Sequence, residues 1–297
     1  MEFDIKMISD PDSFAVGRLP ARTYFEAMQP DGRGRFISPK ILDLDGKWNF
    51  EYAENYASSR QDFFKNEVDC SGWEMINVPG HLQLQGYDKP HYSNTAYPWD
   101  GNENVETGKV PERFNPVGCY VKYFNCPEIP EGYGARIYFG GIESGGAIWL
   151  NGQFIGYKED SFDAGEFDIT NELVPGKNKL AVLVFKWTLG SWFEDQDFFR
   201  FSGIFRSVYI YSVPAVHVED IGIKAIPDED LRDASLKIHM LIKGSGYLNL
   251  ALFDAENNAV LQDRVQTLPE LDLNYAIASP MLWSAEKPYL YRLVLTL

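Results

Sequence analysis

The residues best suited to chemistry lie in one stretch, residues 187–206, where three carboxylates stand among aromatic side chains. These carboxylates are Glu194, Asp195 and Asp197. Carboxylates are seldom buried unless they are paired or coordinated, so the aromatic surroundings require an explanation. Two interpretations are open. The stretch is either a polar turn that faces water, as many charge runs are, or a loop that binds a hard cation or sugar hydroxyl groups.

Glycoside hydrolysis by these three residues is not expected. It requires two carboxyl groups on either side of the scissile bond, about 5 Å apart when configuration is retained. Carboxylates on one short loop project in divergent directions and do not easily flank a sugar ring. We therefore assign no catalytic residue within this chain.

The composition excludes several classes of protein. The 297 residues are 45% hydrophobic and 24% charged, which is close to globular averages and excludes disordered and fibrous proteins. A net charge of -16 argues against a nucleic-acid or anionic-membrane surface but allows neutral sugars as partners. The three cysteines, at irregular spacing, predict free thiols. Without a signal-peptide pattern or a membrane-spanning run, a cytoplasmic location is expected.

Short strands separated by turns must position the carboxylates. The clearest signal is residues 147–157, where Asn151-Gly152 suits the positive φ angles of a type I′ hairpin turn. Residues 180–185 are apolar on both faces and predict a strand buried on both sides. No alternation of strands and helices is present. The predicted fold class is all-β, a sandwich or jelly roll.

The strand pattern restarts near residue 215. Strands are predicted at 216–226, 234–242, 247–253 and 260–267, which is typical of an immunoglobulin-like sandwich. His239 lies within one of these alternating strands, which favours a structural role over a ligand role. We predict an N-terminal arm at 1–40, a first β domain at 41–214 and a second, immunoglobulin-like β-sandwich at 215–297. This last domain is expected to be incomplete, because residues 292–297 read as an inner strand.

A resemblance to a known family emerges from several segments in order. Residues 190–206, with their Glu-Asp-Gln-Asp element, resemble the signature near the end of the first domain of glycoside hydrolase family 2 β-galactosidases, the large bacterial lactase type. Further agreement covers nearly the whole chain, at residues 44–50, 78–94, 115–120, 149–157 and 282–291. The Glu-Asp-Gln-Asp element is specific, whereas Trp-x-Asn-Gly occurs in many sugar-binding jelly rolls.

The resemblance implies roles for particular residues. By matching position, Asn94 would contact galactose, and Asp197 would bind a sodium ion and a sugar hydroxyl. Glu194 and Asp195 would support the loop, through Arg200 or Arg206. The resemblance also implies that 41–214 is a jelly-roll (galactose-binding-like) sugar-binding domain and that 215–297 is an immunoglobulin-like β-sandwich. In that family a third domain, a TIM barrel, carries both catalytic glutamates and the magnesium ligands. A barrel needs ~250 residues of βα repeats, which this chain lacks.

The expected function is therefore that of a fragment of a retaining β-galactosidase that cleaves terminal β-galactosides such as lactose. The expected partners are the β-galactoside, the missing catalytic barrel and, in the parent protein, further copies of itself. The chain departs from the family at His81-Leu82, where Asn-Trp is common, and at Leu189 and Glu159, which makes an extra magnesium site doubtful. Two alternatives stay open: a non-catalytic carbohydrate-binding protein, and a fragment of a β-glucuronidase or β-mannosidase relative.

Overall fold

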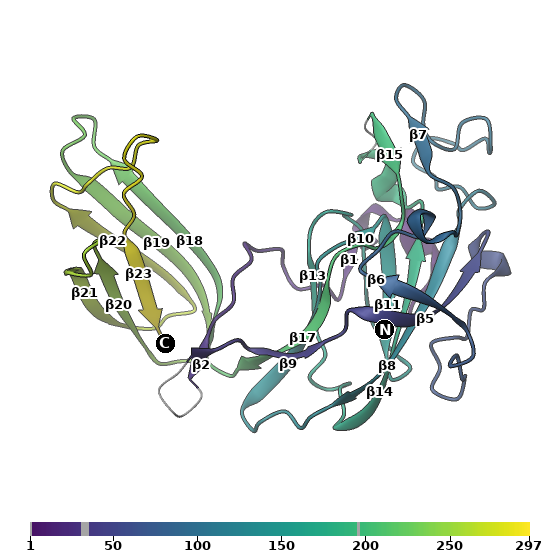
Figure 1. The fold of residues 1–297 in the computed structure, drawn as a ribbon, viewed down its shortest axis with the longest axis horizontal. Helices are drawn as coiled ribbons and strands as arrows, with labels where there is room; N and C mark the ends of the chain where they lie inside the picture. The colour runs from purple at the N-terminus through teal and green to yellow at the C-terminus, as the bar shows by residue number, and fades with distance from the viewer. Residues whose placement is uncertain (1, 31–35, 195–196) are drawn as a thin grey trace. The chain divides into compact units, whose positions relative to one another are not determined.

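The computed structural model describes residues 2–30, 36–194 and 197–297 (Figure 1). The described residues divide into two compact units. The first comprises Ser38–Val213 and the described chain up to Ala21. The second comprises Pro214–Leu297 and the described part of 22–37. The predicted arm at 1–40 is thus shared between the two units. Within the described residues, no helix is long and apolar enough to span a bilayer.

The first unit is built on a seven-stranded sheet in the order β1-β12-β11-β14-β8-β5-β6. In that order its strands are β1 Ala15–Val16, β12 Gln153–Lys158, β11 Gly145–Leu150, β14 Gly176–Phe185, β8 Val117–Cys126, β5 Gly46–Ala53 and β6 Glu74–Val78. A four-stranded sheet pairs β13 Gly165–Asp168, β9 Tyr133–Phe139, β17 Val208–Pro214 and β4 Lys40–Asp43. The all-β jelly-roll prediction is confirmed.

The smaller elements of this unit connect and cover the sheets. Two ribbons pair β10 Ile142–Glu143 with β16 Gly203–Ile204, and β7 His91–Ser93 with β15 Phe198–Arg200. The described helices are short 3-10 turns: η1 Ile5–Ser9, η2 Pro11–Ser13, η3 Tyr56–Ser58, η4 Gln83–Gln85 and η5 Leu189–Trp192. The predicted hairpin is present as β11 and β12, with φ of 51° at Asn151 and 80° at Gly152.

Strand β14 lies in the middle of the large sheet and is buried on both faces, as its sequence predicts. Leu180, Val182 and Val184 point into the core between the two sheets. Alternate residues, among them Leu183 and Phe185, point into a second core on the outer face. That outer core is covered by η1 and by loops that contribute Ile8, Phe63, Val68, Trp99 and Val110. All three cysteines are buried and free.

The second unit is a sandwich of two three-stranded sheets. One has the order β18-β19-β22 and the other β21-β20-β23. The strands are β18 His217–Pro227, β19 Ala234–Lys243, β20 Tyr247–Phe253, β21 Ala259–Gln266, β22 Glu270–Ile277 and β23 Arg292–Thr296. Leucine, isoleucine and methionine side chains from both sheets form one core. This unit also includes the short strands β2 Gln29–Pro30 and β3 Phe36–Ile37.

Strand β23 differs from the expected inner strand. Within the described residues it pairs with β20 alone. Its side chains alternate between partly buried and exposed positions, which is typical of a strand with one buried face. The apolar run Leu293-Val294-Leu295 predicts an inner strand, but how many strands pair with it depends on distant segments and cannot be read from this run.

Candidate functional site

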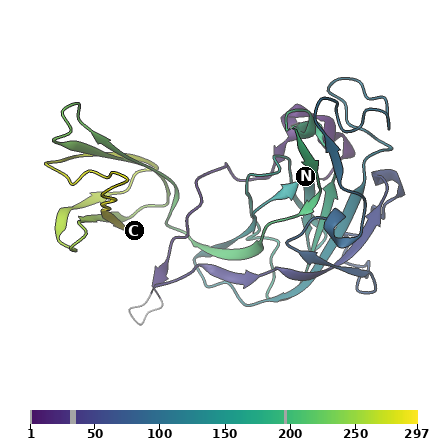
Figure 2. The same cartoon turned by 45° about the horizontal axis from the view of Figure 1, so that its top comes forward.

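The two predicted site residues, Asn94 and Asp197, lie at the same end of the β7–β15 ribbon. The ladder pairs Arg200 with His91, Phe199 with Tyr92 and Phe198 with Ser93. Continued by one residue, this antiparallel register sets Asn94 opposite Asp197. Both are exposed, and β7 and β15 run side by side in both views (Figures 1 and 2). Two segments far apart in the sequence are thereby brought to one location.

The Asp197 carboxylate is held by a tyrosine that the sequence analysis did not single out. The Tyr92 hydroxyl donates to Asp197 Oδ1 at 2.5 Å, and this hydrogen bond raises the pKa of Tyr92. The Tyr92 ring packs beside Phe199, with centroids 5.5 Å apart. Among the described residues, Asp197 Oδ2 has no hydrogen-bond partner. The sequence alone does not mark Tyr92, because its place beside Asp197 follows from the pairing of β7 with β15.

Glu194 supports the loop, but through a different partner from the one expected. Its carboxylate accepts hydrogen bonds from Ser161 N at 2.7 Å and Ser161 Oγ at 2.6 Å. The guanidinium group of Arg206 instead donates to the carbonyl groups of Gly140 and Phe162. Burial raises the pKa of Glu194. Asp195, the other residue expected to support the loop, lies outside the described residues.

Two further buried glutamates lie under the same loop. Glu159 accepts from the Tyr157 hydroxyl at 2.8 Å and from Gly190 N at 2.5 Å, while Glu143 accepts from Phe201 N at 3.3 Å. Burial raises the pKa of both glutamates to about 7. The carboxyl groups thus serve as acceptors for loop N–H groups, which fixes the backbone on either side of Asp197.

His81, one of the departures from the family pattern, lies among the aromatic residues after Asp197. Its ring stacks on Phe205 at 5.1 Å and is tilted against Phe201 at 4.9 Å. Its Nδ1 lies 3.4 Å from Glu143 Oε2 without forming a hydrogen bond. Burial lowers the pKa of His81, so a neutral ring is favoured. His81 therefore acts here as a packing residue that ties its segment to the loop.

A buried polar network joins the chain before β7 to the chain after β15. Gln83 Nε2 donates to Asp88 Oδ2 at 2.8 Å and to Ser202 Oγ at 2.9 Å, and Ser202 N donates back to Gln83 Oε1 at 3.0 Å. Lys186 pairs with the same Asp88 carboxylate. Because these groups are buried and mutually satisfied, the network fixes how the ribbon leaves the large sheet.

Comparison with known families accounts for both units. The model of "Glycosyl hydrolases family 2, sugar binding domain" matches residues 41–214, and "Glycosyl hydrolases family 2" matches residues 216–297. The chain belongs to glycosyl hydrolases family 2. The jelly roll is therefore the sugar-binding domain of this family, and the immunoglobulin-like sandwich is its second domain.

Several relatives of this family 2 chain are β-galactosidases. One from Halalkalibacterium halodurans is 42% identical, over 99% of this chain and 30% of that protein. One from Clostridium acetobutylicum is 41% identical, over 96% of this chain and 32% of that protein. A β-galactosidase large subunit from Leuconostoc lactis is 34% identical, over 99% of this chain and 49% of the subunit. The chain thus spans between about a third and half of these relatives.

Solved structures show the same fold at lower sequence identity. A β-glucuronidase from an uncultured Clostridium species is similar with a TM-score of 0.64 and 20% identity, covering 94% of this chain and 44% of that one. At this identity the likeness concerns the fold alone. It does not distinguish a galactoside from a glucuronide as substrate.

Proposed function

We propose that this chain forms the sugar-binding part of a retaining β-galactosidase and contacts terminal β-D-galactose through Asn94 and Asp197. The relatives that cover nearly all of this chain are named β-galactosidases. The observation that carries the residue assignment is the β7–β15 register, which brings Asn94 and Asp197 to one end of one ribbon.

The chemistry at this end of the ribbon suits a sugar. A carboxylate accepts hydrogen bonds from hydroxyl groups, and an amide both donates and accepts. The exposed rings of Tyr92 and Phe199 lie next to these polar groups. Amphipathic recognition of this kind, with apolar rings beside a few polar groups, is common at binding sites for small molecules.

Asp197 fits a sodium ion as one ligand of several. Hard cations prefer oxygen donors, and the Oδ2 atom of Asp197 has no hydrogen-bond partner among the described residues. A single carboxylate does not complete the coordination shell of such an ion. Sodium, when bound, would supply positive charge next to a sugar hydroxyl, and Asp197 would hold it there. In this chain, water would fill the remaining coordination positions, some of which other parts of the parent protein would supply.

The three glutamates with raised pKa values are not proposed as a catalytic pair. The pKa of Glu143, Glu159 and Glu194 is raised, as a general acid requires. Glu143 and Glu159 are buried and Glu194 is half-buried, and all three are hydrogen-bonded to the chain itself. They are satisfied by backbone and hydroxyl groups rather than arranged on either side of a substrate. In the proposal, the catalytic barrel of the parent supplies the two glutamates and the magnesium ligands.

Saturation-transfer NMR with galactose tests the proposal on this chain. At millimolar galactose in sodium buffer, we expect saturation of the protein signals to be transferred to the bound sugar when the unaltered chain is used. Asp197→Asn should lose most of it, because the amide removes the charge that orders the ion. Replacing sodium by a large organic cation should weaken the signal as well. Glu106→Gln, an exposed charge change elsewhere, is the matched control.

Three outcomes would contradict the proposal. Galactose binding that is unchanged in both Asp197→Asn and Asn94→Ala would place the sugar elsewhere. Preference for glucuronic acid over galactose would favour the glucuronidase-like alternative. Hydrolysis of a nitrophenyl galactoside by this chain alone would contradict the assignment of catalysis to the barrel.

A further inference from the structure

A second group of chemically active side chains lies on the second unit, on the outer face of the β18-β19-β22 sheet. His239 comes from the middle strand β19, and Glu270 and Asp272 come from β22. Their sequence neighbours Ile238, Met240 and Leu271 point into the core of the sandwich. Because successive side chains of a strand point to opposite faces of the sheet, the three polar side chains point outward.

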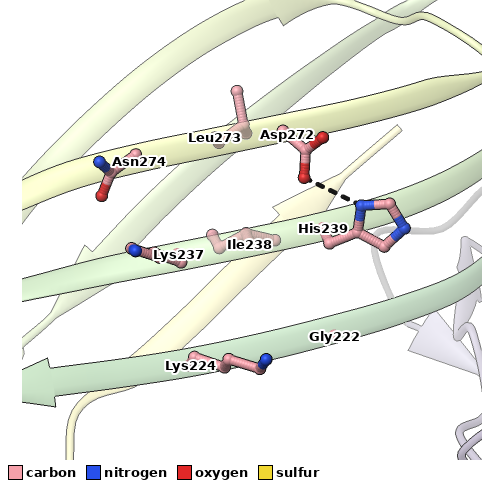
Figure 3. Close-up of a pocket in the computed structure, with 8 residues that line it drawn as sticks. All are labelled: Gly222, Lys224, Lys237, Ile238, His239, Asp272, Leu273 and Asn274. Carbon is pink, nitrogen blue, oxygen red and sulfur yellow. Dashed lines mark hydrogen bonds and ion pairs between the residues drawn. The ribbon is translucent and has the colours of Figure 1, made fainter.

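The register brings the three side chains together. His239 is paired directly with Asp272, and His239 Nδ1 lies 2.9 Å from Asp272 Oδ1. Glu270 occupies the next outward position on β22. One ligand atom from each residue can be chosen so that all lie within 4.8 Å of one another. Figure 3 shows His239 and Asp272 reaching toward each other from adjacent strands.

These distances suit a metal ion after a small adjustment. Two ligands bound to zinc at about 2.0–2.2 Å lie roughly 3.3 Å apart in tetrahedral geometry. The Nδ1 and Oδ1 atoms are already close to that separation, so an ion can replace the proton that they share. Glu270 is exposed, so its side chain can change rotamer and bring its carboxylate to within bonding distance of the ion.

There is open space for the ion and its water ligands. Gly222 of β18 is paired with His239 on the side away from Asp272. Nothing lies within 4 Å of the position that a Cβ on Gly222 would take. The hollow beside these residues has a volume of about 530 Å³ and is lined by Gly222, Lys224, Lys237, Ile238, His239, Asp272, Leu273 and Asn274 (Figure 3).

Carboxylates lie on both strands that pair with β19. Asp272 and Glu270 come from β22, and Asp220 comes from β18 on the other side. Lys224 and Lys237 line the same hollow and add positive charge to it. The three carboxylates near His239 would partly balance the charge of a bound cation.

We propose that His239, Glu270 and Asp272 bind one divalent first-row transition-metal ion, with zinc as the representative. The imidazole ligand selects this class over magnesium and calcium, which prefer oxygen ligands alone. Three protein ligands leave at least one coordination position for water, because the side chains are partly or fully exposed. His239, which the strand pattern assigned a structural role, is then a ligand.

Zinc titration of the untagged, chelator-treated chain tests this proposal. Isothermal titration calorimetry should give one site for the unaltered chain. His239→Gln and Asp272→Asn should each weaken zinc binding by roughly tenfold or more, because each removes a ligand. Long-range ¹H–¹⁵N spectra of the histidine rings should show the His239 resonances shifting on zinc addition, with magnesium producing no shift.

Two controls separate the site from general charge effects. Glu286→Gln removes one exposed charge from the same unit and should leave zinc affinity unchanged. Lys237→Gln removes a positive charge beside the hollow and should leave the affinity equal or higher. Zinc affinity that is unaffected by His239→Gln, or ring signals of His239 that stay fixed at saturation, would overturn the proposal. Circular dichroism of each variant shows whether it folds.

Discussion

Glu143 is a carboxyl group that the structure uses mainly as a hydrogen-bond acceptor. Burial raises its pKa to about 7, with a further contribution from the charge of Glu194. Phe201 N–H and the cations Arg200 and Lys186 act in the opposite direction but do not overcome burial. The folded chain therefore holds a proton on Glu143 over a pH range in which the unfolded chain, near its usual value of 4.5, has lost it.

Glu143→Gln should flatten the dependence of stability on pH. Between about pH 5 and pH 8 the folded state binds more protons than the unfolded state, so the free energy of unfolding falls as pH rises. Glutamine keeps an acceptor oxygen without the charge. We expect the variant to gain on the order of 2 kcal/mol over the unaltered chain at pH 8 and little at pH 5.

Urea unfolding at both pH values measures this difference. Glu106→Gln, at an exposed position, is the control and should leave the pH slope unchanged. An equal slope in Glu143→Gln and the unaltered chain would show that Glu143 is ionised in the folded state at neutral pH.

The loop between β14 and β15 is shaped by contacts to β12 and the residues after it. Glu159 and Ser161 follow β12 and bind the loop at Gly190 and Glu194. These hydrogen bonds join segments that are distant in sequence. The conformation of the loop between β14 and β15 therefore depends on the large sheet that brings the segments together. The position of Asp197 is thus a property of the whole β12–β15 region.

Ser161→Ala should loosen this loop. It removes the hydroxyl donor at 2.6 Å from Glu194 and leaves a buried carboxylate with only the Ser161 N–H. Loss of one hydrogen bond to a charged or buried group costs about 1–3 kcal/mol. Hydrogen exchange should rise at residues 189–194. Ser235→Ala, in the second unit, should change neither stability nor exchange there by a comparable amount.

Sequence patterns predicted the regular elements better than the site. The β11–β12 hairpin and β14 follow from a turn dipeptide and an apolar run, which are local signals. Strand β22 was not among the predicted strands, although Pro269 precedes it and Leu271 and Leu273 alternate with polar residues as in a strand with one buried face. The partners of Glu194 and Asp197 were not predictable in this way, because Ser161 and Tyr92 are brought close only by sheet pairing.

At the scale of the whole molecule, the first unit has two cores on opposite faces of one sheet. The inner core contains Leu180 and the outer core contains Leu183, both on β14. The outer core exists because η1 and long loops cover the sheet. Those loops therefore contribute to the stability of the unit.

Leu180→Ala and Leu183→Ala should destabilise the first unit to a similar extent. Each removes a side chain that is at most 2% exposed, and such changes cost about 2–5 kcal/mol. Leu84→Ala, at a position that is 68% exposed, should change stability by less than about 0.5 kcal/mol. Denaturant unfolding followed by tryptophan fluorescence measures all three. A small effect of Leu183→Ala would mean that the covering loops are loosely packed in solution.

The β7–β15 ribbon has a thermodynamic consequence for the proposed ligands. Three residue pairs join the strand that precedes Asn94 to the strand that follows Asp197. An ion that orders the chain at Asp197 therefore also orders the chain at Asn94. A sugar that binds afterwards loses less conformational entropy of the chain. By reciprocity, a bound sugar must tighten the ion by the same factor, so the two occupancies should rise together.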